Sequence, residues 1–482
     1  MRIATRALGL ALTFCLAASA QAPQPAQPKS PKSSKSPATP KAAAGGFTVP
    51  VTYYKLPNGL KVVLSEDHTA PTTVIAVYYN IGFRIEPRDR TGFAHLFEHL
   101  MFEGSENAPK GTFDKLILGN GGVNNGSTRF DFTNYYEVVP ANVLETMLWL
   151  EADRMARLHL DAEHLKNQQG VVGNEVKVNV LNQPYGGFPW IDMPMAANTN
   201  WYNAHNFYGD LTDIEAATLE DARSFYKTYY APNNAALVVV GDFDPAQAKA
   251  WVEKYFKDIP SGPAKQKVDL TEPRQEKEKR VAREDAIAKR PALAVGYHMP
   301  ERNTPEYYAF ILLDQLLVQG EDSLLRQELV KKRGYTAGVD GGMNLLGNQF
   351  NYNGPMNWMA YLFHDASVSD EQVVSAIDSV IEGVRTKPID TATLERVRTK
   401  LRSDFYDNLG DQNGLGRADL LASLALFDDN PARINDIEKE IAKVTPELMQ
   451  RTAQEYLRSS NRTIVTRVPK ADAAKPATGG GR

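Results

Sequence analysis

The chain is built around one stretch, Thr91-Gly92-Phe93-Ala94-His95-Leu96-Phe97-Glu98-His99-Leu100-Met101-Phe102-Glu103. A helix turns about 100° per residue, so it places His95, Glu98 and His99 on one face and most of the apolar residues on the opposite side. Two imidazoles one turn apart can bind one metal ion, and the carboxylate between them is then free to act as a base. A single buried histidine is more often structural, but the HxxEH order predicts a zinc site.

The composition is that of a globular protein, and its charge limits the class of partner. The chain has 482 residues, 43% of them hydrophobic and 23% charged, which predicts two domains of about 200 residues each. The formal net charge is -4. Residues 1–46 contain two arginines, four lysines and no acidic residue, so the rest of the chain carries -10. An acidic body argues against nucleic acid as the partner.

The N-terminus has the features of a secretory signal peptide at residues 1–20. Arg2 and Arg6 precede an apolar run, and Ala18-Ser19-Ala20 resembles a cleavage site. The run has about 12 apolar residues, too few to cross a bilayer, so we expect export to the bacterial periplasm without a stable membrane anchor. The one cysteine, Cys15, lies inside this segment, which predicts a mature chain without disulfides. Residues 21–46 and 471–482 are predicted to be disordered from their composition.

The two halves of the chain share an order of apolar strand and helix. Residues 73–79 and 291–297 are similar apolar segments, and each precedes a helical pattern, which in the second half contains Tyr308 to Leu313 in place of the histidines. This predicts an α+β fold of two homologous α/β-roll domains from an internal duplication, each a mixed or antiparallel sheet with helices packed on one side. The predicted bounds are 47–268 for a zinc-binding domain, 269–290 for a connector and 291–470 for an inactive domain.

A polar segment follows the HxxEH helix and precedes the apolar strand 134–139. A polar strand beside a metal-binding helix is typical of an exposed sheet edge, where an extended peptide can add through main-chain hydrogen bonds. The alternative is an ordinary solvent-facing loop. The candidate substrate-binding residues are Asn124, Asn125, Gly126 and Thr128. The Pro- and Gly-bearing segment 183–213 is predicted to be a lid or a substrate wall.

A zinc site needs a third protein ligand, and a carboxylate is one usual choice. Spacing alone does not select among Glu145, Glu151, Glu163 and Glu175. The other histidines have no partner at ligand spacing, and we expect them to be structural or surface residues. They are His68, His159, His164, His205, His298 and His364.

From about Tyr53 to Val468 the sequence resembles the pitrilysin or insulinase family of zinc metallopeptidases, and within it the short bacterial members that are similar to processing peptidases. The resemblance rests on residues 95–99, 121–128, 171–175 and 230–242. It implies that His95, His99 and Glu175 bind one zinc ion per chain. It also implies that Glu98 is the general base of an endopeptidase that hydrolyses peptides or unfolded segments.

The sequence departs from this family at two places. The family usually has an acidic residue two turns before the third ligand, where this chain has Gln168, whose amide can support the metal site but carries no charge. The family's second half usually has an arginine and a tyrosine that hold the substrate, where this chain has Val330 and Ala337.

The missing pair suggests the zinc-bearing subunit of a heterodimer, whose homologous partner supplies the arginine and tyrosine. Arg326 and Tyr335 form an alternative, shifted pair within this chain. A non-catalytic peptide-binding or assembly subunit is the other reading, which the intact HxxEH motif disfavours.

Overall fold

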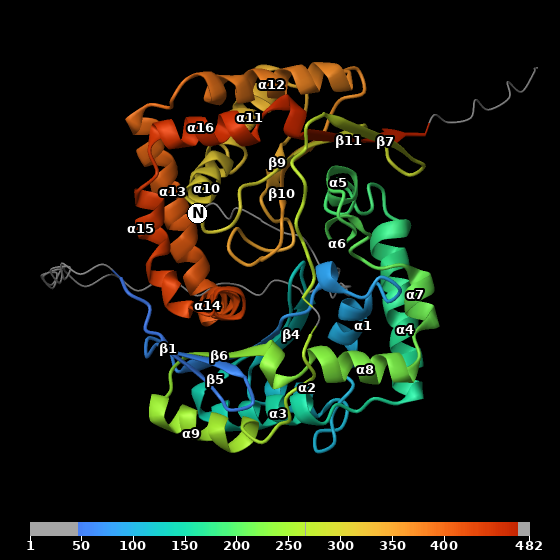
Figure 1. Cartoon of the computed structure of the whole chain (residues 1–482), viewed down its shortest axis with the longest axis vertical. Coiled ribbons are helices and arrows are strands. Elements are labelled where there is room, and N and C mark those ends of the chain that lie inside the picture. The colour runs from blue at the N-terminus through green and yellow to red at the C-terminus, as the bar shows by residue number, and fades with distance from the viewer. Residues whose placement is uncertain (1–46, 266, 471–482) are drawn as a thin grey trace, which may run out of the picture. The chain divides into compact units, whose positions relative to one another are not determined.

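The computed structural model describes residues 47–265 and 267–470, and Figure 1 labels most of its helices and strands. The predicted signal peptide, the linker at 21–46 and the tail at 471–482 lie outside these residues. From Thr48 onward the described chain forms one unit. Within the described residues, every helix is too short or too polar to cross a bilayer.

The first half contains a six-stranded sheet in the order β1-β2-β6-β3-β5-β4. Only β2 and β6 are parallel, and the other neighbours are antiparallel, so the sheet is mixed. The hairpin between β1 and β2 turns at Gly59, whose φ of 90° favours glycine. The strands are β1 (Thr52–Lys55), β2 (Lys61–Glu66), β3 (Thr72–Tyr79), β4 (Val123–Thr128), β5 (Thr133–Pro140) and β6 (Ala235–Gly241).

The second half repeats this topology in a five-stranded sheet, β7-β11-β8-β10-β9. Its one parallel pair, β7 and β11, corresponds to β2 and β6. The repeat extends to single side chains, because Asn234 donates to the carbonyls of Asn80 and Tyr229, and Asn461 donates to those of His298 and Tyr456. The strands are β7 (Lys279–Asp285), β8 (Ala292–His298), β9 (Asp340–Gly342), β10 (Asn357–Phe363) and β11 (Arg462–Pro469). The predicted fold class is confirmed.

Helices cover both sheets. Those of the first half are α1 (Phe93–Leu100), α2 (Thr112–Gly119), α3 (Leu144–Ala156), α4 (Ala162–Val176), α5 (Asp192–Ala197), α6 (Trp201–Ala204), α7 (Leu211–Ala216), α8 (Leu219–Tyr229) and α9 (Pro245–Phe256). Those of the second half are α10 (Pro305–Leu317), α11 (Leu324–Arg326), α12 (Asp370–Thr386), α13 (Thr391–Gly410), α14 (Leu415–Asp428), α15 (Ile437–Ala442) and α16 (Pro446–Tyr456). Helix α4 continues as a π-helical turn over Lys177–Leu181, and a second π-helical turn covers Gln327–Lys332.

The apolar strand β3 is buried on both faces, which explains its continuous apolar sequence. Ile75 and Val77 pack into a core with α1, α3 and α9, whereas Val74 and Ala76 pack into a core that includes α14 of the second half. Conversely, α5 of the first half packs on β8, β10 and β11 of the second sheet. Each sheet therefore has its own helices on one face and a helix from the other half on the opposite face.

The segment predicted as a lid or substrate wall and the predicted connector both contain regular structure, and in the connector this agrees with the solvated strand that its charge pattern suggested. The predicted lid or substrate wall at 183–213 contains α5, α6 and the start of α7. Its buried residues include Met193, whose side chain occupies the space that a side chain at Gly296 would need. The predicted connector at 269–290 contains β7, whose exposed and less exposed side chains alternate. Charged residues fit there because β7 is an edge strand with one neighbour.

Candidate metal centre

The first turn of helix α1 is capped by the buried carboxylate of Glu86, which the sequence did not reveal. Gly92 precedes the helix with a φ of 83° and offers no capping side chain. The two oxygens of Glu86 instead accept from the backbone N–H groups of Gly92 (2.9 Å) and Ala94 (2.6 Å). Glu86 is fully buried, and burial raises its pKa to about 8, although the two N–H donors act in the opposite direction. The polar face of α1 is thus held at its first turn.

The structure brings together His95 and His99 of α1 and Glu175 of α4, two helices that pack against each other. Nε2 of His95 lies 3.5 Å from Oε1 of Glu175, and Nε2 of His99 lies 3.3 Å from Oε2. Hydrogen bonds from both imidazoles lower the pKa of Glu175 well below its usual value. Glu175 lies in the last turn of α4, immediately before the π-helical turn.

The three side chains fit one zinc ion in their chemistry and spacing. Two imidazole nitrogens and a carboxylate are usual zinc donors. Donor atoms about 2.1 Å from a tetrahedral ion lie roughly 3.4 Å apart, which agrees with the 3.3 Å and 3.5 Å separations observed. Of the four glutamates that spacing left open, only Glu175 joins the histidines in a metal-binding group among the described residues.

Burial lowers the pKa of His99, but its contacts with Glu175 and Glu98 outweigh burial, so the pKa lies above its usual value. The ring therefore holds a proton more strongly than a free histidine does. A metal ion that binds here must displace that proton.

Glu98 lies on the same face of α1 and is held by the strand β4. Its Oε2 accepts a hydrogen bond from the hydroxyl of Thr128 over 2.7 Å. Thr128 is buried, and its hydroxyl contacts the HxxEH helix at Glu98 and at the carbonyl of Ala94. Thr128 therefore holds the Glu98 carboxylate in place, in addition to the substrate contact that the sequence suggested.

The other candidate substrate residues lie on the edge strand β4, the last strand in the sheet order. Asn125 is exposed, and Asn124 donates to Asp114. Gly126 is buried, and a side chain there would lie within 3.1 Å of the Phe102 ring. The backbone of β4 is thus fixed on one side by β5.

Gln168 lies between His99 and a second buried carboxylate. Its side-chain N–H donates to Oε1 of Glu103 over 2.7 Å, and the same amide hydrogen-bonds the His99 ring. Because the amide nitrogen faces Glu103, the amide oxygen is the group that accepts from His99. Glu103 is also paired with Lys110. The family usually has a carboxylate at residue 168, in contact with the histidine. In this chain the carboxylate belongs to Glu103, and Gln168 lies between it and His99.

Tyr208 is a further neighbour that sequence reasoning missed. Its hydroxyl donates to Oε1 of Glu175 over 2.8 Å, and its ring lies 5.0 Å from the His95 ring. Trp190 also contacts Tyr208, with 5.5 Å between the ring centroids. The segment predicted as a substrate wall therefore contributes a side chain that contacts the metal centre.

The second half supplies Val330 and Ala337 where the family has its arginine and tyrosine. The alternative pair has partners close by in the chain, since Arg326 binds Glu321 and the Tyr335 hydroxyl accepts from Arg333. These contacts give no support to a shifted pair.

Two of the remaining histidines were wrongly read as unpartnered. The rings of His159 and His164 lie 4.9 Å apart, with Asp161 between them. On one continuous helix residues five apart diverge, but α4 begins at Ala162 and the chain turns before it. His205 and His298 face backbone carbonyls, and His68 and His364 each face an aspartate.

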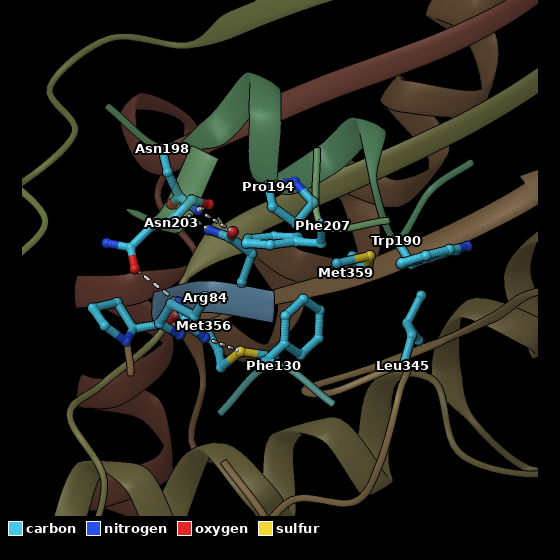
Figure 2. A pocket seen from close by; sticks show the side chains of 12 residues that line it. Arg84, Phe130, Trp190, Pro194, Asn198, Asn203, Phe207, Leu345, Met356 and Met359 are labelled. Carbon is cyan, nitrogen blue, oxygen red and sulfur yellow. Dashed lines mark hydrogen bonds between the residues drawn. The ribbon is translucent and has the colours of Figure 1, made fainter. Parts of the chain in front are cut away.

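A pocket between β10 and the segment 183–213 is lined by residues of both halves, among them Arg84, Trp190 and Met359 (Figure 2). Arg84 is buried and committed to Asp131 (2.7 Å), Asn203 (2.7 Å) and the carbonyl of Pro355 (2.8 Å). The pocket contains none of the candidate metal ligands. Its polar groups hold the two halves together.

Comparison with known proteins identifies two matching family models. Residues 61–185 match the model described as insulinase, peptidase family M16, and residues 216–401 match the model described as the peptidase M16 inactive domain. Together these two ranges span more than half of the chain.

Individual proteins similar to this chain are also named as proteases or as a peptidase subunit. The zinc protease PqqE of Helicobacter pylori is 27% identical over 424 residues, which cover 85% of this chain and 91% of that protein. A solved protease structure from Helicobacter pylori matches with a TM-score of 0.81 and 25% identity, over 88% of this chain and 100% of that one. A probable mitochondrial-processing peptidase subunit beta of Arabidopsis thaliana is 23% identical over 43% of this chain and 39% of that protein.

Proposed function

The chain belongs to the M16 family of peptidases, and from that premise we propose that it is a zinc-dependent endopeptidase acting on peptides or unfolded segments. The observation that carries the proposal is the convergence of His95, His99 and Glu175 around one point, with Glu98 beside them on the same helix face. One zinc ion per chain is held by these three side chains.

The roles of the residues follow from their chemistry. Zinc in such a donor set is a Lewis acid that polarises a peptide carbonyl and promotes attack by water near neutral pH. Glu98 is not a ligand, so it takes a proton from the attacking water and passes it to the leaving amine when the C–N bond breaks. The Thr128 hydroxyl keeps the Glu98 carboxylate in one orientation. The edge strand β4 binds the extended substrate through its backbone and through Asn124 and Asn125.

Two measurements on the purified mature chain test this proposal. We expect wild type to hold zinc, and Glu98→Gln to hold as much zinc but to cleave peptides roughly 10²–10⁴ times more slowly. Replacement of Glu175 by alanine removes the zinc. Glu145→Gln is the matched control, because Glu145 is a partly exposed glutamate paired with Lys254, outside the candidate metal centre. The proposal fails if wild type binds no zinc, or if Glu98→Gln cleaves as fast as wild type.

In this proposal the chain is the zinc-bearing subunit of a heterodimer with a homologous chain that carries the arginine and tyrosine. Val330 and Ala337, which lack hydrogen-bonding side chains, support the division of labour. The name of the Arabidopsis thaliana relative, a subunit beta, agrees with it. Peptide cleavage is therefore weak for the chain alone and rises when the homologous subunit is added. Full activity of the isolated chain would contradict the need for a partner.

The same two residues favour a second candidate, a non-catalytic peptide-binding or assembly subunit. This candidate predicts that wild type and Glu98→Gln bind peptide equally and that neither cleaves it, even with the homologous subunit present.

Export to the periplasm is the third part of the proposal, and it rests on residues 1–20. Cell fractionation checks this part, because a mature chain that begins near residue 21 is expected in the periplasmic fraction.

A further inference from the structure

His159, Asp161 and His164 form a cluster outside the candidate metal centre, at the start of α4. Asp161 lies at the N-cap of α4, where one carboxylate oxygen, Oδ1, accepts from the backbone N–H of His164 over 2.8 Å. That hydrogen bond lowers the pKa of Asp161 and keeps the carboxylate ionised. The second oxygen, Oδ2, is left to face the two imidazoles.

The donor atoms have the spacing of ligands around one ion. Oδ2 of Asp161 lies 3.2 Å from Nε2 of His159 and 2.9 Å from Nδ1 of His164. Donors of a tetrahedral zinc site lie roughly 3.4 Å apart, and the His95 centre has separations of 3.3 Å and 3.5 Å. The two groups thus offer the same donor types at similar spacing.

Nδ1 of His164 is a buried atom that faces Oδ2 of Asp161 at 2.9 Å. A buried imidazole nitrogen that faces a carboxylate oxygen at this distance can share one metal ion with it.

The surroundings of the cluster are those of a built site. The opposite nitrogen of His164, Nε2, faces Oε2 of the buried Glu103 at 3.6 Å, the carboxylate–histidine arrangement that orients metal ligands. The backbone N–H of His159 donates to the carbonyl of Gly104, the residue after Glu103, so the main chain at His159 lies close to Glu103. His159 is 55% exposed, so an ion can enter from solvent and keep a water ligand.

We propose that His159 Nε2, Asp161 Oδ2 and His164 Nδ1 bind a second first-row transition-metal dication, with Zn²⁺ as the probe. It is distinct from the ion held by His95, His99 and Glu175. Glu103 contacts His164 through one oxygen and Gln168 through the other. The proposed second site therefore shares Glu103 with the residues that support the first centre. Its test must distinguish zinc bound at the second site from zinc bound at the first.

Equilibrium dialysis of the purified mature chain against micromolar free zinc, followed by metal analysis, tests the proposal. Wild type is expected to bind two zinc ions per chain, the His159→Ala/His164→Ala protein one, and the His95→Ala/His99→Ala protein one. The matched control is His68→Ala, since His68 is an exposed histidine that faces an aspartate, Asp242, at 2.6 Å. It is expected to bind two.

A second variant guards against a folding defect. Asp161→Asn keeps a side chain that caps α4 but removes the charged ligand, so it should weaken the second zinc at least about tenfold. Cobalt(II) provides an optical readout. The His95→Ala/His99→Ala protein should still show cobalt absorption, and the addition of Asp161→Asn to that protein should remove it.

The proposal is overturned if the His159→Ala/His164→Ala protein binds as many zinc ions as wild type, or if the His95→Ala/His99→Ala protein binds none. Zinc bound at the first centre alone would overturn this proposal and leave the proposed peptidase function standing. If the His95→Ala/His99→Ala protein still binds two ions, the proposed zinc site of the peptidase is wrong instead.

Discussion

The side-chain amide of Gln168 donates to the buried carboxylate of Glu103 over 2.7 Å. The relationship explains how this chain tolerates an amide where its family usually has an acid. The carboxylate charge is retained at Glu103, and the Gln168 amide links it to His99, because its N–H donates to Glu103 and its oxygen accepts from the His99 ring. A return to the family's residue would therefore place two carboxylates against each other.

Gln168→Glu is expected to destabilise the zinc-free protein at pH 8 by roughly 1–3 kcal/mol, because two buried carboxylates at this distance cannot both stay ionised. Glu103→Gln in the same protein exchanges the two groups and should recover most of the loss. Urea denaturation of both single variants and the double variant gives the coupling energy. Additive effects of the two changes would show that the residues do not interact.

Tyr208→Phe tests whether the tyrosine supports the third ligand. The change removes the 2.8 Å hydrogen bond to Glu175 and keeps the ring that packs on His95. Zinc affinity should fall by about tenfold, as is typical when a ligand loses a supporting hydrogen bond. Competition with a chelator measures this. Tyr255→Phe is the matched control, because its hydroxyl also donates to a glutamate, Glu145, over 2.8 Å. Equal zinc affinity in the two variants would contradict the supporting role.

Glu86 should make stability depend on pH through the first turn of α1. Burial raises its pKa to about 8, from 4.5 in the unfolded chain. The folded state therefore holds a proton that the unfolded state has lost, so the stabilisation is complete below pH 4.5 and is lost as the pH rises through 8. The slope contributed by Glu86 cannot exceed about 1.4 kcal/mol per pH unit.

Glu86→Gln removes that titration, so its free energy of unfolding should fall less steeply between pH 5 and pH 8 than that of wild type. Thermal and urea denaturation at several pH values compare the two slopes. Gln also weakens the cap, which lowers stability at every pH but leaves the slope unaffected. Parallel curves for the two proteins would show that Glu86 stays ionised throughout.

The sequence was sufficient where the signal is local. The periodicity of residues 91–103 predicts α1 and places His95, Glu98 and His99 on one face, and the apolar segments at 73–79 and 291–297 predict β3, β8 and the duplication. The helix and the two strands depend only on neighbours within a few turns of chain, and the duplication follows from the likeness of two such local patterns.

Contacts between distant residues were beyond sequence reasoning. Glu103 lies 65 residues from Gln168, and Tyr208 lies 33 residues from Glu175. The pairing of α5 and α14 with the opposite sheets depends on how the two halves pack, which no periodicity encodes. The cluster of His159 and His164 did carry a local signal, since Asp161 is a good N-cap residue that marks a turn between them.

Thr128 offers a test that separates catalysis from substrate binding. Its hydroxyl donates to Oε2 of Glu98 over 2.7 Å, and removal of this hydrogen bond in Thr128→Val leaves the Glu98 carboxylate free to rotate away from its working position. We expect kcat to fall by about tenfold with zinc content unchanged, because supporting hydrogen bonds hold catalytic groups in place. Thr128→Ser keeps the hydroxyl and should stay near wild type. A rise in KM at constant kcat would instead show that Thr128 acts through the substrate strand.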